Sequence, residues 1–300
     1  MLDLNDGVTM RDMAYGEYKL RFWQRWMLLS CQQMPVSWIG RRLALWLRKL
    51  VLLARNAPID AVAEGFRLRV HVRDNVSERK YLFMPQFCDP AERAYLVRHL
   101  SLDGVFLDIG ANAGIYTLTA ARAYAAGHGS GQVIAVEPNP VMQARLQTNL
   151  RFNQLESRVI VAPLALAASS GEVMLAINQH NLGESRCSET DGLRVPALSL
   201  LDLLAAHAVT RLDGMKIDVE GMEDEILLPF LAHAPDVLLP RFIIIEDSTR
   251  RWKHDLLAAL LQHGYLVVGR FKMNIVLSLP DQHKNMVENS TLMDIKNQVR

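Results

Sequence analysis

The sequence has only three cysteines and lacks any long uninterrupted apolar run. Cys31, Cys88 and Cys187 lie far apart and show no CxxC spacing, so the sequence supports neither a disulfide framework nor a cysteine zinc site. No window approaches the roughly 18 uncharged apolar residues that a membrane span requires. Charged residues near the N-terminus are also atypical of a cleaved signal peptide. We therefore expect a cytoplasmic protein.

A net charge is almost absent as well, since 33 Lys and Arg residues balance 32 Asp and Glu residues. The whole chain has no field that would gather nucleic acid, and we expect no such partner. The cations are nevertheless unevenly distributed. Residues 18–59 contain eight cations and four tryptophans but no acid. The apolar spacing over residues 18–55 predicts one or two helices with a break near Pro35.

This basic, Trp-rich stretch has two open interpretations. One is an interfacial helix on anionic lipid, at the inner face of a membrane, where basic residues meet head groups and indoles sit at the boundary. The other is a helix packed on the rest of the protein with its arginines in water. We assign residues 1–60 to this helical extension.

A small entry module is predicted at residues 61–100. Between 66 and 73 apolar and basic residues alternate, which predicts a half-buried strand with a basic outer face. Asp74 and Asn75 indicate a turn. Residues 81–83 are then predicted to form a returning strand.

From residue 105 onward, short apolar runs are separated by segments with helical spacing, which is typical of a parallel sheet buried on both faces. Over residues 101–280 this predicts an α/β fold with a doubly wound, mostly parallel sheet of about seven strands, which binds ligands at the carboxyl ends of its strands. An extra strand at 172–177 and a polar loop through 191 should shape a ligand site, and residues 281–300 form a polar tail. The predicted strands are 105–109, 133–136, 159–162, 215–219, 242–245, 266–268 and 275–277, and the predicted helices are 115–126, 140–153, 198–207, 224–234 and 252–263.

A glycine-rich turn at 108–114 follows the first of these strands and opens a helix. Its glycines let the backbone pass close to a ligand, and the helix start offers N–H groups to an anion. Asn112 stands where a dinucleotide fingerprint has its second glycine, which disfavours a pyrophosphate. Glu137 ends the next strand, where a carboxylate can accept both hydroxyls of a ribose. The candidate cofactor-binding residues here are Asp108, Gly110, Asn112, Gly114, Glu137, Pro138 and Asn139.

These two motifs describe a ribose-bearing ligand without a pyrophosphate and with a charged amino-acid end. S-adenosylmethionine is the common molecule of that kind. A second cluster follows at the end of the fourth strand, where Lys216, Asp218 and Glu220 share one side of an extended segment. Pairing with these acids or with Glu246 would offset the cost of burying the lysine. Two interpretations of this cluster stay open, a structural network of ion pairs and a catalytic site.

The ordered motifs resemble those of the FkbM-type methyltransferases, over about residues 80–270. The resemblance implies a class I methyltransferase fold, Rossmann-like, with S-adenosylmethionine as cofactor. It also implies O-methylation of hydroxyls, often on sugars, glycolipids or secondary metabolites. Arg186 departs from the family pattern of paired small hydroxyl residues and is consistent with an anionic acceptor. The matching segments are 106–114, 137–139, 149 with 153, 181–185, 195–202, 216–223 and 245–246.

Methyl transfer needs a positioned acceptor oxygen and a base. Asp218 is our first choice for the base and is also a candidate cofactor contact, with Glu220 and Glu246 behind it. Lys216 would stabilise the developing oxyanion or orient Asp218. His180, beside the motif at 181, is an alternative base. Because the lysine lies among the acids, we expect no metal.

Two other classes of function stay open. A nicotinamide oxidoreductase is disfavoured by Asn112 and by the glycine spacing. A non-catalytic membrane or partner scaffold could keep the same fold. The expected substrate is a small-molecule or glycan hydroxyl, and the oligomeric state stays open.

Overall fold

The structure is a computed structural model that describes residues 14–53, 57–188 and 191–280. The predicted polar tail at 281–300 lies outside the described residues, as do residues 1–13 of the predicted extension. Within the described part of the chain, no helix has the length and apolar character needed to cross a membrane.

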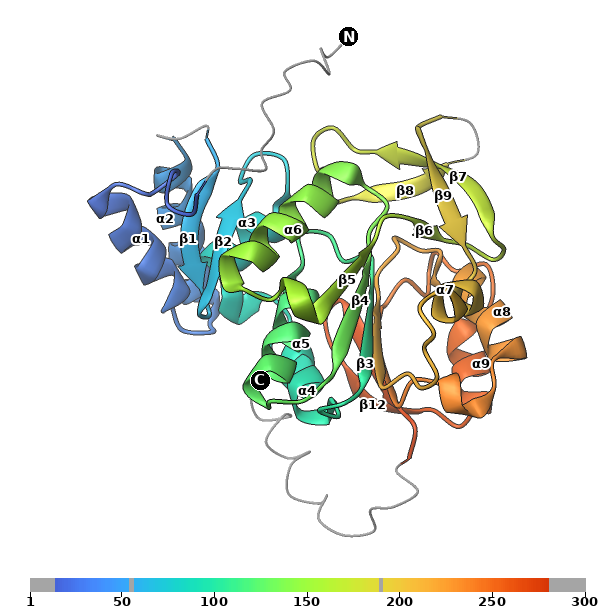
Figure 1. Cartoon of the computed structure of the whole chain (residues 1–300). Coiled ribbons are helices and arrows are strands. Elements are labelled where there is room, and N and C mark those ends of the chain that lie inside the picture. The colour runs from blue at the N-terminus through green and yellow to red at the C-terminus, as the bar shows by residue number, and fades with distance from the viewer. Residues whose placement is uncertain (1–13, 54–56, 189–190, 281–300) are drawn as a thin grey trace.

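A seven-stranded sheet forms the centre of the molecule, in the order β12-β13-β11-β10-β3-β4-β5 (Figure 1). β13 runs antiparallel to both neighbours and the other strands run parallel to one another. The prediction of a mostly parallel sheet of about seven strands is thus confirmed. The strands are β3 (Val105–Ile109), β4 (Gln132–Val136), β5 (Val159–Ala162), β10 (Gly214–Ile217), β11 (Phe242–Glu246), β12 (Leu266–Arg270) and β13 (Asn274–Ser278).

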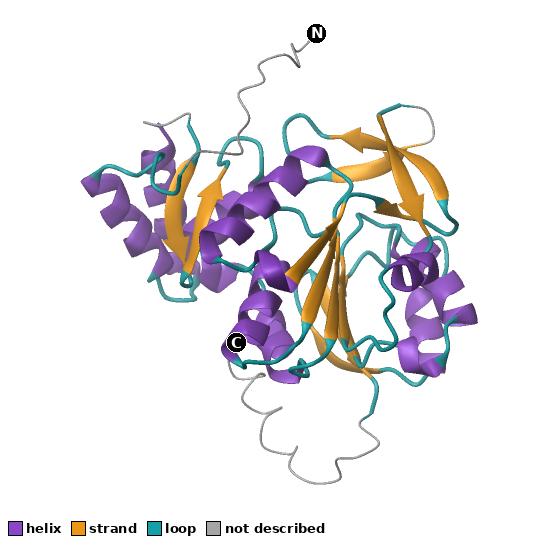
Figure 2. Cartoon of the chain, viewed as in Figure 1, coloured by secondary structure: helices purple, strands orange, loops and turns teal. Residues whose placement is uncertain are grey.

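Helices cover both faces of this sheet (Figure 2). On β3, Phe106 packs into the core under the helices of one face, while Leu107 and Ile109 pack into the core of the other. This alternation explains why the strand is apolar at consecutive positions. One face carries α4 (Pro90–His99) and α5 (Ile115–Ala126), with α6 (Pro140–Asn153) and the short η2 (Glu156–Arg158) beside β5, and the other carries α7 (Leu200–Ala206), α8 (Glu223–His233), η3 (Asp236–Leu238) and α9 (Leu256–Gln262).

The N-terminal part begins with α1 (Phe22–Gln32) and α2 (Trp38–Leu53), and their break at 33–37 contains Pro35, as predicted. An unpredicted strand, β1 (Ile59–Ala63), pairs antiparallel with β2 (Phe66–Val70) and runs across the domain boundary predicted at residue 60. The predicted returning strand at 81–83 is wrong, because these residues end α3 (Val76–Phe83). Asn75 caps this helix by accepting the Glu78 N–H at 3.0 Å. The 3-10 turn η1 (Pro85–Phe87) then leads to α4.

The predicted basic outer face of β2 is wrong at Arg69, because α6 packs on it. The Arg69 guanidinium is buried in an ion pair with Asp60 at 2.8 Å. The backbone N–H groups of Arg67 and Arg69 donate to the amide oxygens of Asn153 and Asn149, each at 3.0 Å. These contacts join the N-terminal module to the sheet domain.

The insertion after β5 forms a small four-stranded sheet in the order β6-β9-β7-β8. The extra strand predicted at 172–177 is confirmed as β7. The prediction of a polar loop through 191 is wrong, because β8 lies within it and pairs antiparallel with β7. The side chain of Arg186 lies outside the described residues. The strands are β6 (Ala165–Leu166), β7 (Gly171–Ile177), β8 (Ser185–Ser188) and β9 (Leu193–Leu198).

Candidate active site

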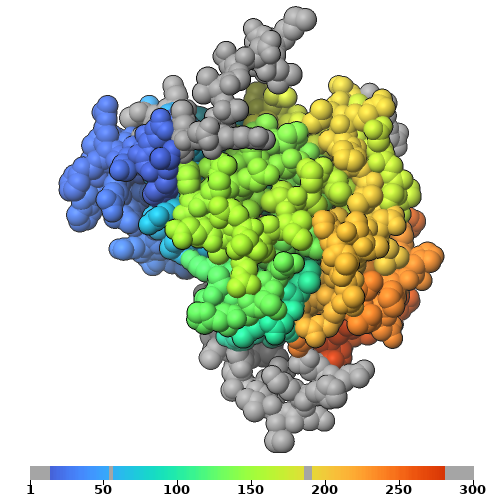
Figure 3. Space-filling model, viewed as in Figure 1, coloured from blue at the N-terminus to red at the C-terminus, as the bar shows by residue number. Residues whose placement is uncertain are grey.

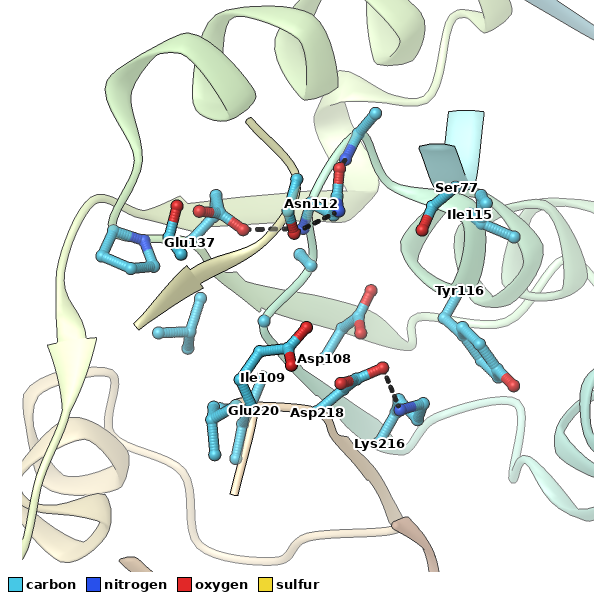
Figure 4. A pocket seen from close by; sticks show the side chains of 18 of the residues that line it. Ser77, Asp108, Ile109, Asn112, Ile115, Tyr116, Glu137, Lys216, Asp218 and Glu220 are labelled. Carbon is cyan, nitrogen blue, oxygen red and sulfur yellow. Dashed lines mark hydrogen bonds and ion pairs between the residues drawn. The ribbon is translucent and has the colours of Figure 1, made fainter. Parts of the chain in front are cut away.

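A pocket opens at the carboxyl ends of β3, β4 and β10, where the fold predicts a ligand site (Figure 4). Asp108 and Glu137 both line it, as do Lys216, Asp218 and Glu220. The two predicted clusters, which are far apart in the sequence, therefore meet at one pocket. The carboxylates of Asp108 and Glu137 thus lie at one common hollow.

The glycine turn brings β3 against the residues that follow β10. Gly110 has a φ of +77°, and a Cβ there would lie 2.0 Å from the carbonyl oxygen of Asp218. Glycine is therefore required both by the backbone conformation and by this contact. Gly114 has a φ of +96° and faces Leu146 of α6, where a Cβ would lie 2.3 Å from the side chain. It packs two helices together and does not line the pocket.

Asp108 lies buried at the end of β3, directly below the turn. Its carboxylate accepts a hydrogen bond from the Thr117 hydroxyl at 2.5 Å. Burial raises the pKa of this carboxyl to about 6, although the Thr117 hydrogen bond and the Lys216 charge lower it. In Figure 4 the side chain points into the hollow between Glu137 and Asp218.

Glu137 is held by two backbone N–H groups. One carboxylate oxygen accepts from Asn112 at 2.7 Å and the other from Asn139 at 2.9 Å. Burial raises the pKa of the Glu137 carboxyl to about 7, and these two hydrogen bonds oppose that rise. A carboxylate has about four lone-pair sites, so about two remain for hydroxyl donors from the pocket. This arrangement fits the two hydroxyls of a ribose.

The side chain of Asn112 joins three segments. Its backbone is left-handed with a φ of 52°, its amide oxygen accepts from Asn75 at 2.8 Å, and its amide nitrogen donates to the Gly183 carbonyl at 3.0 Å. The glycine turn, the start of α3 and the loop before β8 are thereby fixed together. Asn112 shapes the site by these links and by its backbone N–H to Glu137.

Lys216 and Asp218 form an ion pair at the end of β10. The ammonium nitrogen lies 3.1 Å from a carboxylate oxygen of Asp218 and also donates to the carbonyl of Ile217 at 3.3 Å. Burial lowers the pKa of Lys216, but attraction and hydrogen bonding by Asp218 outweigh it and raise the pKa above its usual value. The lysine side chain is 3% exposed and that of Asp218 is 43% exposed. A buried cation therefore supports a carboxylate that the pocket can reach.

Glu220 and Glu246 are both bound by Arg251. The guanidinium lies 3.0 Å from Glu220 and 2.7 Å from Glu246. Burial raises the pKa of each glutamate, and Arg251 opposes the rise. Among the described residues, no group of three His, Cys, Asp or Glu side chains could hold a metal ion.

The FkbM methyltransferase domain matches residues 108–267, which contain the glycine turn, Glu137 and the Lys216–Asp218 pair. This chain belongs to the FkbM methyltransferase family. It is a methyltransferase whose cofactor is S-adenosylmethionine. The oxidoreductase interpretation of the glycine turn is overturned by this match.

Solved methyltransferase structures are similar to this FkbM methyltransferase at low identity. A precorrin-6y C5,15-methyltransferase from Geobacter metallireducens is 17% identical, with 63% of this chain and 87% of that chain covered and a TM-score of 0.38. An S-adenosylmethionine-dependent O-methyltransferase from Thermotoga maritima is 11% identical, with 65% and 67% covered and a TM-score of 0.38. TrmK of M. capricolum, solved with S-adenosylhomocysteine, is 11% identical, with 67% and 73% covered and a TM-score of 0.36. The search of curated proteins found no match.

Besides Gly114, three candidate residues of the FkbM methyltransferase lie away from the pocket lining. Asn139 is buried and caps α6 by accepting the Val141 N–H at 3.0 Å, while its amide donates to Leu182 at 2.9 Å. Glu246 is held by Arg251 and Ser248. His180 is exposed on the loop between β7 and β8. Pro138, in contrast, lines the pocket next to Glu137.

One wall of the pocket comes from residues that the sequence did not indicate. Ser77 and Lys80 of α3 line it, together with Asp89 before α4 and Tyr116 of α5. The Tyr116 hydroxyl lies 3.4 Å from Asp89, and its ring centroid lies 5.4 Å from the Lys216 ammonium. Nothing in the apolar spacing of 61–100 indicates that this module folds over the glycine turn.

Proposed function

We propose that this methyltransferase acts on a hydroxyl oxygen of a sugar, a glycolipid or a secondary metabolite, with Asp218 as the general base. The observation that carries the proposal is the pairing of a buried ammonium, on Lys216, with a reachable carboxylate, on Asp218, beside the glycine turn. An alcohol is a weak acid, so its oxygen needs a base as it becomes a nucleophile.

The cofactor half of the pocket is assigned to the ends of β3 and β4. When bound, S-adenosylmethionine supplies an electrophilic methyl group. Glu137 would accept the ribose hydroxyls with the lone pairs that its backbone contacts leave over. Asp108 would attract the ammonium of the amino-acid end, and the N–H groups at the start of α5 would bind its carboxylate.

The acceptor half is assigned to Asp218 and the wall that faces it. As the acceptor oxygen takes the methyl group, its proton passes to the Asp218 carboxylate and S-adenosylhomocysteine remains as product. Lys216 has three N–H donors, and the described residues accept two of them, so the third can stabilise charge on the acceptor oxygen. The side chains of Ser77, Lys80 and Asp89 offer donors and acceptors suited to a polyhydroxylated molecule.

Asp218→Asn tests this role, because asparagine keeps the size of the side chain but is not a base. We expect turnover to fall by about 10²- to 10⁴-fold, as for the loss of a general base, while S-adenosylhomocysteine affinity changes only a few-fold. Calorimetry measures the affinity, and a methyl-transfer assay over a panel of hydroxylated acceptors measures turnover. Asp236→Asn, at an exposed position in η3, is the matched control.

Near-normal methylation by Asp218→Asn would remove this residue from the chemistry. In that case Glu220, which also lines the pocket, is the next base to substitute. Binding of S-adenosylhomocysteine without methylation of any hydroxyl by the natural protein would instead overturn the proposal of a hydroxyl acceptor.

A further inference from the structure

The two N-terminal helices expose large apolar side chains to solvent. Five of these side chains are aromatic rings. Such a concentration is unusual, because exposed apolar residues on soluble proteins are normally scattered singly. In Figure 3 these helices stand at one edge of the molecule, in blue. The side chains are 40% to 79% exposed and belong to Phe22, Trp23, Trp26 and Leu29 of α1 and to Trp38, Ile39, Leu43, Trp46 and Leu53 of α2.

On α2 the exposed apolar residues are not the ones that pack into the protein. Ile39, Trp46 and Leu53 recur every seven residues and therefore lie along one side of the helix. Ala44 and Val51, on the opposite side, are fully buried. Packing within the protein therefore explains why the inner side of α2 is apolar. It does not explain why the outer side is apolar as well.

The same division holds on α1. Phe22, Trp26 and Leu29 lie along its outer side, at spacings of four and three residues. Leu28 and Cys31 are buried on its inner side, where the Cys31 thiol lies 3.4 Å from the Ala44 carbonyl of α2. Both helices are thus anchored in the core through one side and present a second apolar side outward.

The charge on these helices has one sign. Arg25, Arg42 and Lys49 are exposed and form no ion pair with another residue that the structure describes. Arg42 and Lys49 flank Trp46, at positions four before and three after it, and the Arg42 guanidinium lies 4.8 Å from the Trp38 ring centroid. No Asp or Glu occurs between residues 18 and 53.

We propose that the outer sides of α1 and α2 bind an anionic lipid surface. Their rings and aliphatic chains would enter the boundary between head groups and acyl chains, and their cations would contact lipid phosphates. The charge argues for this occupant. A symmetric second copy would bring the same cations against one another. A nucleic acid would match the cations but would offer no apolar phase for the aliphatic side chains.

The experiment is flotation of the full chain with two kinds of vesicle, one of phosphatidylcholine alone and one of phosphatidylcholine mixed with phosphatidylglycerol. We expect binding to the mixed vesicles, weakened by salt, and little binding to the neutral ones. The double variant Arg42→Gln with Lys49→Gln should bind on the order of 30-fold more weakly, since each surface cation contributes about 1 kcal/mol. The double variant Trp26→Ser with Trp46→Ser should also lose binding.

The matched control is Arg98→Gln with Arg211→Gln, which removes two exposed cations from the sheet domain. It should bind as the natural protein does. All substituted positions are exposed, and far-ultraviolet circular dichroism with S-adenosylhomocysteine binding verifies that each variant is folded. Absence of binding to the mixed vesicles overturns the proposal. An equal loss in the control also overturns it, as does self-association that the Trp variant abolishes while vesicles remain unbound.

Discussion

Acidification should weaken cofactor binding through Glu137. The pKa of its carboxyl is raised to about 7 by burial, and in the proposed site a ribose hydroxyl would donate to the ionised form. If binding requires ionisation, the affinity at about pH 5 should be on the order of 100-fold below its limit at high pH, because only about 1% of the free protein is ionised there. At about pH 7 the loss should be only about two-fold.

Calorimetric titrations with adenosine and with S-adenosylhomocysteine across this pH range provide the assay. Adenosine carries the ribose without the amino-acid end, so its pH dependence reports on Glu137. S-adenosylhomocysteine adds a second contribution from Asp108, whose pKa is raised by burial to about 6. Glu137→Gln should bind both ligands weakly and show no pH dependence with adenosine. An adenosine affinity that is constant with pH, or a slope that survives in Glu137→Gln, would refute the assignment.

Titration of Glu137 would not weaken ligand binding at low pH by unfolding the protein. The pKa of Glu137 in the folded protein lies above its ordinary value of 4.5. The folded protein therefore holds this proton more tightly than the unfolded chain, so the stability contribution of Glu137 is greatest below about pH 4.5 and falls as the pH rises through about 7. Acidification stabilises the fold at this residue while it weakens ligand binding.

Two further predictions concern the glycine turn and metals. Gly110→Ala should lower the free energy of unfolding in urea by about 1–3 kcal/mol, because its Cβ would meet the Asp218 carbonyl and its φ is positive; unchanged stability would contradict the contact. Chelation with EDTA should leave methyl transfer intact, because Lys216 already neutralises Asp218. A loss of activity that magnesium restores would contradict that expectation.

Most of the central sheet could be predicted from the sequence because both faces of its strands are buried. Such strands are continuous apolar runs, and the spacing of α5 and α6 predicted their bounds as the structure has them. Strand β8 has no comparable pattern. Its sequence is polar, and it is held by pairing with β7, which no local pattern reports. The strand predicted at 81–83 failed for a different reason, since Asn75 with Glu78 three residues later is a local helix-start signal that was not used.

The residues of the candidate site likewise fall into those that the sequence could predict and those that it could not. Asp108 lies at the end of a strand, and Glu137 and Asp218 follow strands. The topology alone brings these strand ends to one edge of the sheet. Arg251 is missed because its partners Glu220 and Glu246 belong to other segments. The wall containing Ser77 and Lys80 depends on tertiary docking through Asn75 and Asn112. Spacing along the chain carries no signal for such contacts.

The pairing of Asn75 with Asn112 has a consequence for how substrate preference can change in this protein. The proposed base Asp218 follows a strand of the central sheet, whereas α3, which supplies Ser77 and Lys80, lies before the segment that matches the family domain. Substitutions in α3 can thus alter which molecule is admitted without disturbing the chemistry.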